Sequence, residues 1–321
     1  MKGGVEVAQL IKLQDYITRY EWDTFRYPTQ YIRLKKENWD RLYEKWSQPE
    51  EKSSEQFIQD QEQEPGGLLS KLKDKLLKRS VYSETIIESV EEENELPSTE
   101  KELKQQFLDH LLNFQLKWAT STVNHQSIID KKYKDDPLLK YLLQRFPDTY
   151  LLMYHPVFTI KQAPIEADII FISPIEIEII HFVELEESAV LMAGEERTWH
   201  VESPDENRKI LNPLISLKRT EKVIRSILSV KELSFPVKKT IISRTNPIMF
   251  SSEPYQTRIV DKMSFDSWFL GKRQLNSPLK NDQIKVAEAL LGYCQSISIR
   301  RPEWEDVPEE SPHITEEMEE Y

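Results

Sequence analysis

The chain has 321 residues, of which 39% are hydrophobic and 31% are charged, a composition typical of one or two soluble domains. It contains no run of about 18 apolar residues and no secretory signal pattern, so no membrane span is expected and the protein is predicted to be cytoplasmic. Its single cysteine, Cys294, excludes intrachain disulfides and cysteine metal clusters. The apolar helical pattern around Cys294 predicts a buried thiol rather than a nucleophile.

The net charge of −12 is unevenly distributed along the chain. Residues 99–302 carry 28 basic and 26 acidic groups, whereas residues 48–98 carry 6 and 13, and residues 303–321 carry 9 acidic groups and no basic one. The acidity therefore belongs to a linker and a tail. It does not argue against binding of nucleic acid by the body of the protein.

These shifts predict four regions: an aromatic-rich helical segment (1–47), a polar and flexible linker (48–98), an α/β domain (99–302) and an acidic tail (303–321). In the first region, two sets of apolar residues at helical spacing predict a helical hairpin broken near Pro28. The two sets are Leu10, Leu13, Tyr16, Ile17 and Tyr20, and Trp39, Leu42, Tyr43 and Trp46.

The first region also mixes basic and aromatic side chains. Arg19, Arg26 and Arg33 recur every seven residues among tyrosines, Trp22 and Phe25, a mixture that can stack bases and contact phosphates. Aromatic residues at this density usually bury, so packing on the body, or docking of a protein partner through residues 5–46, is favoured over strand binding.

The body alternates helix and strand. Thr99 with Glu102 has capping-box spacing, and Asp136 followed by Pro137 predicts a helix over 138–146. Strands are expected at 150–159, 167–173, 176–184 and 188–192, followed by a polar loop, a helix over 213–228, strands at 237–243 and 257–261, and a closing helix over 282–296. This order predicts an α/β fold with a mixed central sheet flanked by helices.

Three carboxylates stand out in the body. Asp168 begins a strongly apolar strand, where an unpaired carboxylate is costly, and strand alternation would put Glu184 and Glu186 on one face. Carboxylates this close together repel one another unless they share a cation or are fully exposed. For Glu184 and Glu186, the alternative to a metal site is a solvated strand end. His181 is expected to be a packed strand residue rather than a catalytic base.

The element order, together with a set of short motifs, resembles the nuclease-related domain (NERD), a branch of the PD-(D/E)xK, restriction-endonuclease-like superfamily. The motifs are Asp168, Ser173-Pro174, Glu184, Trp199 and Asn212-Pro213-Leu214, within residues 135–273. The resemblance implies a restriction-endonuclease-like mixed sheet. It also implies cleavage of DNA or RNA with Mg²⁺ or Mn²⁺, with Asp168 and Glu184 as metal ligands.

The chain departs from this family at site-shaping positions. Glu186 stands where the family has lysine, Ser216 where it has glutamine, and the turn glycine after Ser-Pro is absent. The interval from Asp168 to Glu184 is a few residues long, and only Asp135 or Asp136 represents the acidic residue of the first helix. Because the lysine ammonium orients the attacking water and offsets developing charge, a carboxylate in its place argues for a degenerate site.

Two functions follow from this reasoning. The favoured one is a catalytically degenerate module that interacts with nucleic acid or protein. The alternative is an active Mg²⁺- or Mn²⁺-dependent nuclease in which Asp168, Glu184 and Glu186 bind metal and Lys218 replaces the missing lysine. The nucleic-acid-binding candidates lie on one helical face: Lys218, Lys222 and Arg225.

Overall fold

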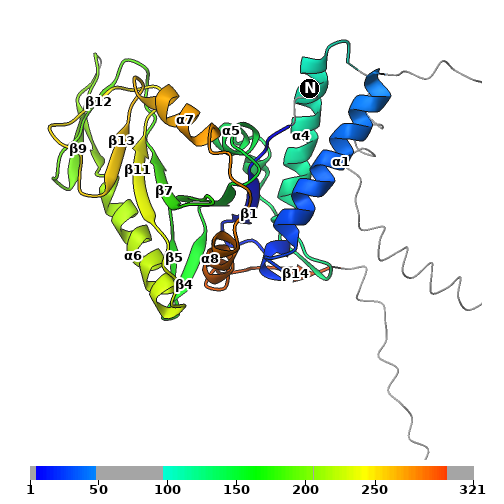
Figure 1. Cartoon of the computed structure of the whole chain (residues 1–321). Coiled ribbons are helices and arrows are strands. Elements are labelled where there is room, and N and C mark those ends of the chain that lie inside the picture. Colours follow the sequence, from blue (N-terminus) through cyan, green and yellow to red (C-terminus); the bar gives the residue numbers. More distant parts are fainter. Residues whose placement is uncertain (1–4, 48–96, 205, 302–321) are drawn as a thin grey trace, which may run out of the picture.

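The computed structural model describes residues 5–47, 97–204 and 206–301. The predicted acidic tail, and the predicted linker apart from Pro97 and Ser98, lie outside these ranges. The largest element is a six-stranded mixed sheet (Figure 1), which confirms the predicted mixed central sheet flanked by helices. Its strands in spatial order are β1 (Gln9–Leu13), β3 (Leu151–Tyr154), β6 (Ile169–Ile172), β7 (Ile177–Phe182), β11 (Val237–Ile242) and β13 (Thr257–Val260).

Antiparallel and parallel pairings divide this sheet. The strands β3, β6 and β7 form an antiparallel meander, whereas β1 joins β3, β11 joins β7 and β13 joins β11 in parallel. The parallel strand β11 follows a crossover through α6 (Leu214–Val230). Because β7, β11 and β13 are parallel, all three strands begin at the same end of the sheet.

Helices cover both faces of the sheet because the buried strands are apolar on both sides. On β7, Ile177 and Ile179 belong to the apolar cluster under α6 and α8 (Asn281–Leu291), whereas Ile180 belongs to the cluster under α5 (Pro137–Arg145) and α7 (Phe265–Arg273). Figure 1 shows these two pairs of helices on opposite sides of the strands. None of the helices in the described ranges is long and apolar enough to cross a membrane.

The predicted helix starts are confirmed where a capping residue marks them. α4 (Glu100–Trp118) begins with the Thr99 and Glu102 capping box. At the start of α5, Asp136 Oδ1 accepts hydrogen bonds from the backbone N–H groups of Leu138 and Leu139.

A second, smaller sheet occupies the region predicted as a polar loop, so that prediction is wrong. Its order is β10 (Arg208–Leu211), β9 (Thr198–Glu202), β8 (Val190–Met192) and β12 (Ile248–Met249). In β9, Trp199 and Val201 are buried while His200 and Glu202 are exposed, which is the alternation of a strand with one face in solvent. Two short pairs complete the fold: β4 (Val157–Ile160) with β5 (Ala163–Glu166), and β2 (His125–Gln126) with β14 (Ile299–Arg300).

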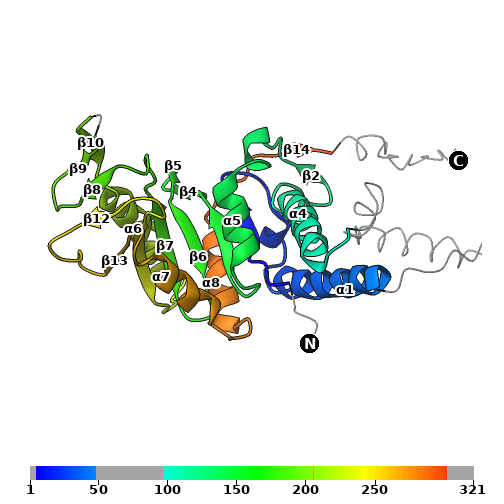
Figure 2. The same ribbon diagram turned by 90° about the horizontal axis from the view of Figure 1, so that it is seen from above.

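The amino-terminal segment is half strand and half helix. The predicted first helix is wrong, because Gln9–Leu13 forms β1, whose residues are all buried. The predicted second helix is confirmed as α1 (Tyr27–Ser47), which starts beside Pro28. Tyr31 and Trp39 of α1 pack their rings against α4, as Figure 2 shows for the two helices. Packing of these aromatic residues on the body is therefore confirmed, whereas Trp22 and Phe25 are 66% and 48% exposed.

Candidate functional site

The β6–β7 hairpin positions Asp168 opposite His181. The turn is closed by Ser173, whose Oγ accepts a hydrogen bond from the backbone N–H of Glu176, and the ladder pairs Ile169 with Ile180. Asp168 and His181 are the next residues along the two strands, so they lie opposite each other across the hairpin. Asp168 Oδ1 lies 2.6 Å from His181 Nδ1.

Two hydroxyl groups from α6 complete the surroundings of the Asp168 carboxylate. Ser216 Oγ donates to Oδ1 at 3.1 Å, and Thr220 Oγ1 donates to Oδ2 at 2.9 Å. Thr220 Oγ1 also accepts a hydrogen bond from the backbone N–H of Asp168 at 3.1 Å. Asp168 is only 5% exposed, and these partners offset the cost of burying its charge.

His181 has the geometry of an oriented acid or base. Its Nδ1 faces Asp168 and lies 3.1 Å from Ser216 Oγ, while its Nε2 forms no hydrogen bond with any described residue. In a nucleophilic triad, the carboxylate and the hydroxyl use different ring nitrogens. Here both use Nδ1, so Ser216 is not arranged as an activated nucleophile, whereas the 33% exposed imidazole can exchange a proton through Nε2.

A second histidine lies within electrostatic range of this site. His155 follows β3 and adopts a φ of 47°, a left-handed conformation uncommon for a residue other than glycine. Burial lowers its pKa, and a hydrogen bond with the backbone of Ala167 and the nearby charges of Glu166 and Asp168 oppose that shift. Neutral imidazole is therefore the favoured form of His155.

Glu184 does not share a site with Asp168. The strand β7 ends at Phe182, so Glu184 leaves the sheet on the α5 side and pairs with Arg244, whose guanidinium lies 5.0 Å from the Tyr141 ring. Asp168 faces α6 on the other side. The hydrogen bonds that Arg244 donates to Glu184 raise the pKa of Arg244, which keeps that pair charged.

Glu186 lies beyond the strand as well. Its Oε2 accepts a hydrogen bond at 2.8 Å from Arg208, which belongs to the small sheet. The structure therefore does not bring the predicted metal ligands Asp168, Glu184 and Glu186 together. Within the described ranges, no three His, Cys, Asp or Glu side chains are grouped so that they can hold a metal ion.

Strand alternation identifies the residues that do share the face of Asp168. These are His181 and Val183, three positions before Glu184 and Glu186, and Val183 is buried in the apolar cluster under α6. The interval between Asp168 and Glu184, a few residues longer than in the family, was the sequence signal that Glu184 does not lie opposite Asp168. Strand alternation alone did not reveal this, because the apolar pattern does not show that β7 ends at Phe182.

The basic residues of α6 are exposed and lie away from the carboxylate. In the described structure, Lys218 forms no hydrogen bond or ion pair, with Asp168 or any other residue, and the same holds for Lys222. Arg225 pairs with Glu221 at 2.8 Å. Lys218 is therefore not placed as a substitute for the missing lysine, whereas Lys218 and Lys222 present free ammonium groups to solvent.

The remaining residues of the resemblance have structural roles. Asn212 Oδ1 accepts from the backbone N–H of Leu214 at the start of α6, and its Nδ2 donates to the carbonyls of Gly194 and Glu196. Trp199 Nε1 donates to the Gly194 carbonyl as well. Both residues fix the loop that delivers α6, and thereby Ser216 and Thr220, to Asp168.

Comparisons with known proteins give one short match. No family model matches the chain, and no solved structure matches it significantly. An RNA 2',3'-cyclic phosphodiesterase of Geobacillus stearothermophilus is 33% identical over 128 residues, which cover 36% of this chain and 38% of that relative. The chain therefore spans well under half the length of this relative, and the match does not assign a family.

Proposed function

We propose that this protein is a NERD-like, restriction-endonuclease-like module that binds nucleic acid without metal-dependent cleavage. The observation that carries the proposal is the Asp168 carboxylate, whose partners are His181, Ser216 and Thr220 rather than a second carboxylate and an ammonium group. Hydrolysis assisted by Mg²⁺ or Mn²⁺ needs a carboxylate pair to hold the ion and a group to activate water.

The element order supports the nuclease-related part of the proposal. The helix α5, the meander β3, β6 and β7, the helix α6 and the strand β11 follow one another in the order on which the resemblance rests. Asp168 stands at the start of the second meander strand, and Asn212-Pro213 opens α6, as that order requires.

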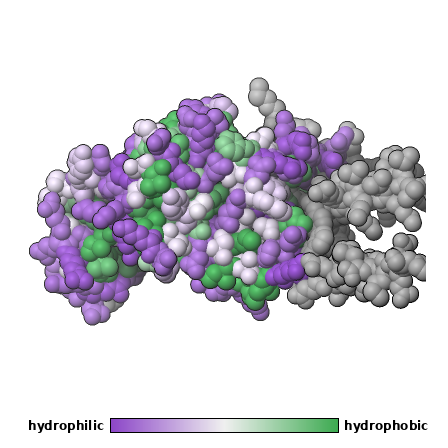
Figure 3. All heavy atoms as spheres, turned by 90° about the horizontal axis from the view of Figure 1, so that it is seen from below, coloured by the Kyte–Doolittle hydropathy of each residue, from purple (hydrophilic) through white to green (hydrophobic). Residues whose placement is uncertain are grey.

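Surface charge supports binding of nucleic acid. Lys218 and Lys222 lie on the exposed side of α6, and cations without a protein partner are available for phosphate contacts. The face of the molecule seen in Figure 3 is largely polar, with apolar residues in separate small groups rather than one continuous patch. The RNA-directed name of the matched relative agrees with a nucleic-acid ligand.

The test is binding of labelled single- and double-stranded DNA and RNA by the full chain, with cleavage monitored in Mg²⁺ and Mn²⁺. We expect binding that weakens with salt, no metal-dependent cleavage, and severalfold weaker binding in the double variant Lys218→Gln/Lys222→Gln, since two phosphate contacts are lost. The matched control is Lys36→Gln/Lys101→Gln, which removes two exposed lysines from α1 and α4. Metal-dependent cleavage, or no binding of any nucleic acid, would overturn the proposal; in the second case a protein partner becomes the target.

A second candidate function uses His181 as a metal-independent acid or base on an RNA 2',3'-cyclic phosphate. It is favoured by the free Nε2 of His181, by the Asp168 carboxylate that orients the ring, and by the name of the matched relative. Water that gives its proton to the His181 imidazole would attack phosphorus, and the leaving 2' or 3' oxygen would take a proton from the His181 imidazolium or from solvent.

Chelation separates this candidate from the others. Hydrolysis of a 2',3'-cyclic nucleotide that persists in EDTA and is lost in His181→Ala would support it. Absence of hydrolysis by well-folded protein, or activity unchanged in His181→Ala, would reject it.

A further inference from the structure

The small sheet buries one of its faces and presents the other to solvent. Its inner row consists of Ile248 of β12, Leu191 of β8 and Val201 of β9, which pair across the three strands and belong to the apolar cluster under α6. The next residue along each strand points the opposite way, so a second row of side chains lies on the outer face. Figures 1 and 2 show this sheet at the opposite end of the molecule from α1.

Two methionines and a histidine form that outer row. Met249 of β12 pairs with Met192 of β8, and Met192 pairs in turn with His200 of β9. Met249 and Met192 are 56% and 37% exposed, and His200 is exposed as well. Neighbouring strands lie about 4.7–4.9 Å apart, so Met192 has a second thioether on one side and an imidazole on the other.

The polar ends of these side chains are free to converge on a ligand. Methionine is unbranched and has three rotatable bonds, so its sulphur can reach over a neighbouring strand position. Within the described ranges, the ring nitrogens of His200 form no hydrogen bond. A groove of about 360 Å³ is lined by Met192 and His200, which leaves space for an ion beside them.

Two thioethers and an imidazole are a soft set of metal ligands. Thioether sulphur selects Cu(I), imidazole also suits copper, and hard ions such as Mg²⁺ prefer oxygen. Lys209 is the next residue in the row beyond His200, and its ammonium repels a divalent cation about twice as strongly as a monovalent one. Both features favour Cu(I) over Mg²⁺ or Zn²⁺.

We propose that Met192, Met249 and His200 bind one Cu(I) ion through two sulphur atoms and one imidazole nitrogen. The ligands come from three adjacent strands, and strands hold ligands more rigidly than loops do. The site lies on a different sheet from Asp168. It requires neither nucleic acid nor the lysines of α6, so it is independent of the function proposed above.

Two exposed methionines have another use, which is to form an apolar surface for a protein partner. Methionine and leucine have similar volumes, so Met→Leu variants separate the two uses. Leucine keeps an apolar surface but offers no atom that can bind a metal ion. A contact that depends on apolar area would therefore survive these variants, whereas a Cu(I) site would not.

The first test follows the methionine methyl groups by NMR in the full chain with isotope-labelled methionine. The titrant is Ag(I), which is redox-inert and also prefers sulphur, and Cu(I) is then added without oxygen. We expect one equivalent to shift the signals of Met192 and Met249, assigned by their loss in Met192→Leu and Met249→Leu. The signals of Met153, which is buried, and of Met263, which is 84% exposed, should not move.

The second test measures Cu(I) affinity by competition with a coloured chelator. Met192→Leu, Met249→Leu and His200→Gln should each weaken binding by about 10–100-fold, the loss that removal of even an outer-shell partner of a metal causes. Met263→Leu is the matched control and should bind as the wild type does. Cys294→Ala is the second control, because a thiol also binds Cu(I), and it should keep the wild-type affinity.

Three results would overturn the proposal: no shift of the two methyl signals with either ion, wild-type affinity in both methionine variants, or loss of binding in Cys294→Ala alone. Zn²⁺ that shifts the same methyl signals as strongly as Ag(I) would overturn it as well, since thioethers do not select Zn²⁺. Cu(I) binding by a chain that binds no nucleic acid would keep this site and reject the function proposed above.

Discussion

Asp168 and His181 are 13 residues apart in the sequence and lie 2.6 Å apart across the β6–β7 hairpin. The carboxylate that the sequence pattern assigned to a metal ion is instead bound to an imidazole and two hydroxyl groups. This relationship depends on hairpin register, because a shift of one residue would turn His181 toward the opposite face of the sheet.

The hydrogen bonds of Asp168 predict a difference in stability between two carboxylate variants. Asp168→Asn should lower the free energy of unfolding by about 2 kcal/mol, since the amide cannot accept from Ser216, Thr220 and His181 together. Glu184→Gln should lower it by about 1 kcal/mol or less, because its ion pair with Arg244 is partly exposed. Denaturant unfolding followed by tryptophan fluorescence measures both values, and equal losses would contradict this account of the site.

The register of β7 predicts how a metal site could be restored. His181→Glu with Val183→Lys creates a Glu-x-Lys pair on the face of Asp168, and we expect this double variant to gain Mg²⁺-dependent cleavage of DNA or RNA. The control is Glu186→Lys, which places the lysine at the position first expected from the sequence. Cleavage by the control alone would show that the register argument is wrong.

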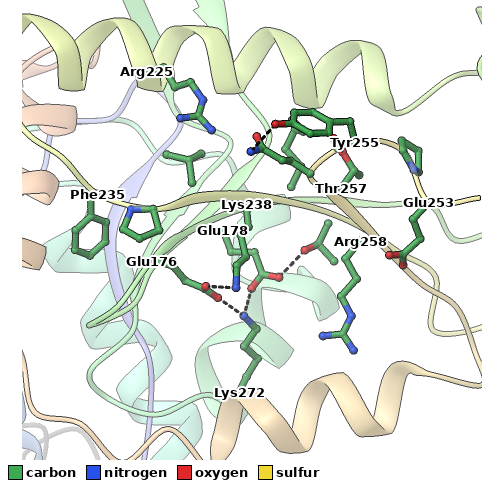
Figure 4. A pocket seen from close by; sticks show the side chains of 16 residues that line it. Glu176, Glu178, Arg225, Phe235, Lys238, Glu253, Tyr255, Thr257, Arg258 and Lys272 are labelled. Carbon is green, nitrogen blue, oxygen red and sulfur yellow. Dashed lines mark hydrogen bonds and ion pairs between the residues drawn. The ribbon is translucent and has the colours of Figure 1, made fainter.

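At the start of β7, Lys272 pairs with Glu176 and Glu178, and Lys238 also pairs with Glu176 (Figure 4). This charge network predicts a free energy of unfolding that depends on pH. The pKa of Glu176 is lowered, so its contribution is present above the ordinary carboxyl value of 4.5 and is lost as pH falls through the lowered pKa. Burial would lower the pKa of Lys272, but Glu178 and Glu176 outweigh it and raise that pKa, so its contribution is present below 10.5 and is lost as pH rises through the raised value.

Lys272→Met tests this window. At about pH 7 the variant should lose about 3–5 kcal/mol, because two buried carboxylates are left without their shared cation. The loss should shrink as Glu176 becomes protonated in acid. A loss that stays constant from neutral pH down to about pH 3, below the ordinary carboxyl range, would contradict the assignment.

The single cysteine gives a prediction about reactivity. Burial raises the pKa of the Cys294 thiol to about 12, so very little reactive thiolate is present in the folded protein near about pH 8. We expect slow reaction with a disulfide reagent in the native state and rapid reaction in denaturant. Rapid native-state labelling would show that the segment after α8, in which Cys294 lies, opens readily.

The features that sequence reasoning predicted correctly are local. Thr99 and Asp136 mark helix starts because their side chains bind backbone N–H groups of the first turn, and that chemistry depends on neighbours only. The first segment was predicted incorrectly because β1 is buried on both faces. Its apolar residues therefore show no alternation, and Leu10, Leu13 and Ile17 fit helical spacing equally well.

The site was less predictable because its residues come from distant elements. Asp168 was identified from the apolar strand that follows it, and its burial is confirmed. Its actual partners on β7 and α6 depend on where a strand ends and on how a helix packs. The row of Met192, Met249 and His200 gave no motif at all, since its residues belong to three strands that meet only in the folded protein.

The pairing of β1 with β3 has a consequence for synthesis of the protein. Gln9 finds its partner Leu151 only after more than a hundred further residues have been translated. At about 5–20 residues per second, this takes roughly 7–30 s. During that time β1 is without its native neighbour on the nascent chain, so this strand completes its pairing only after the much later strand β3 has been made.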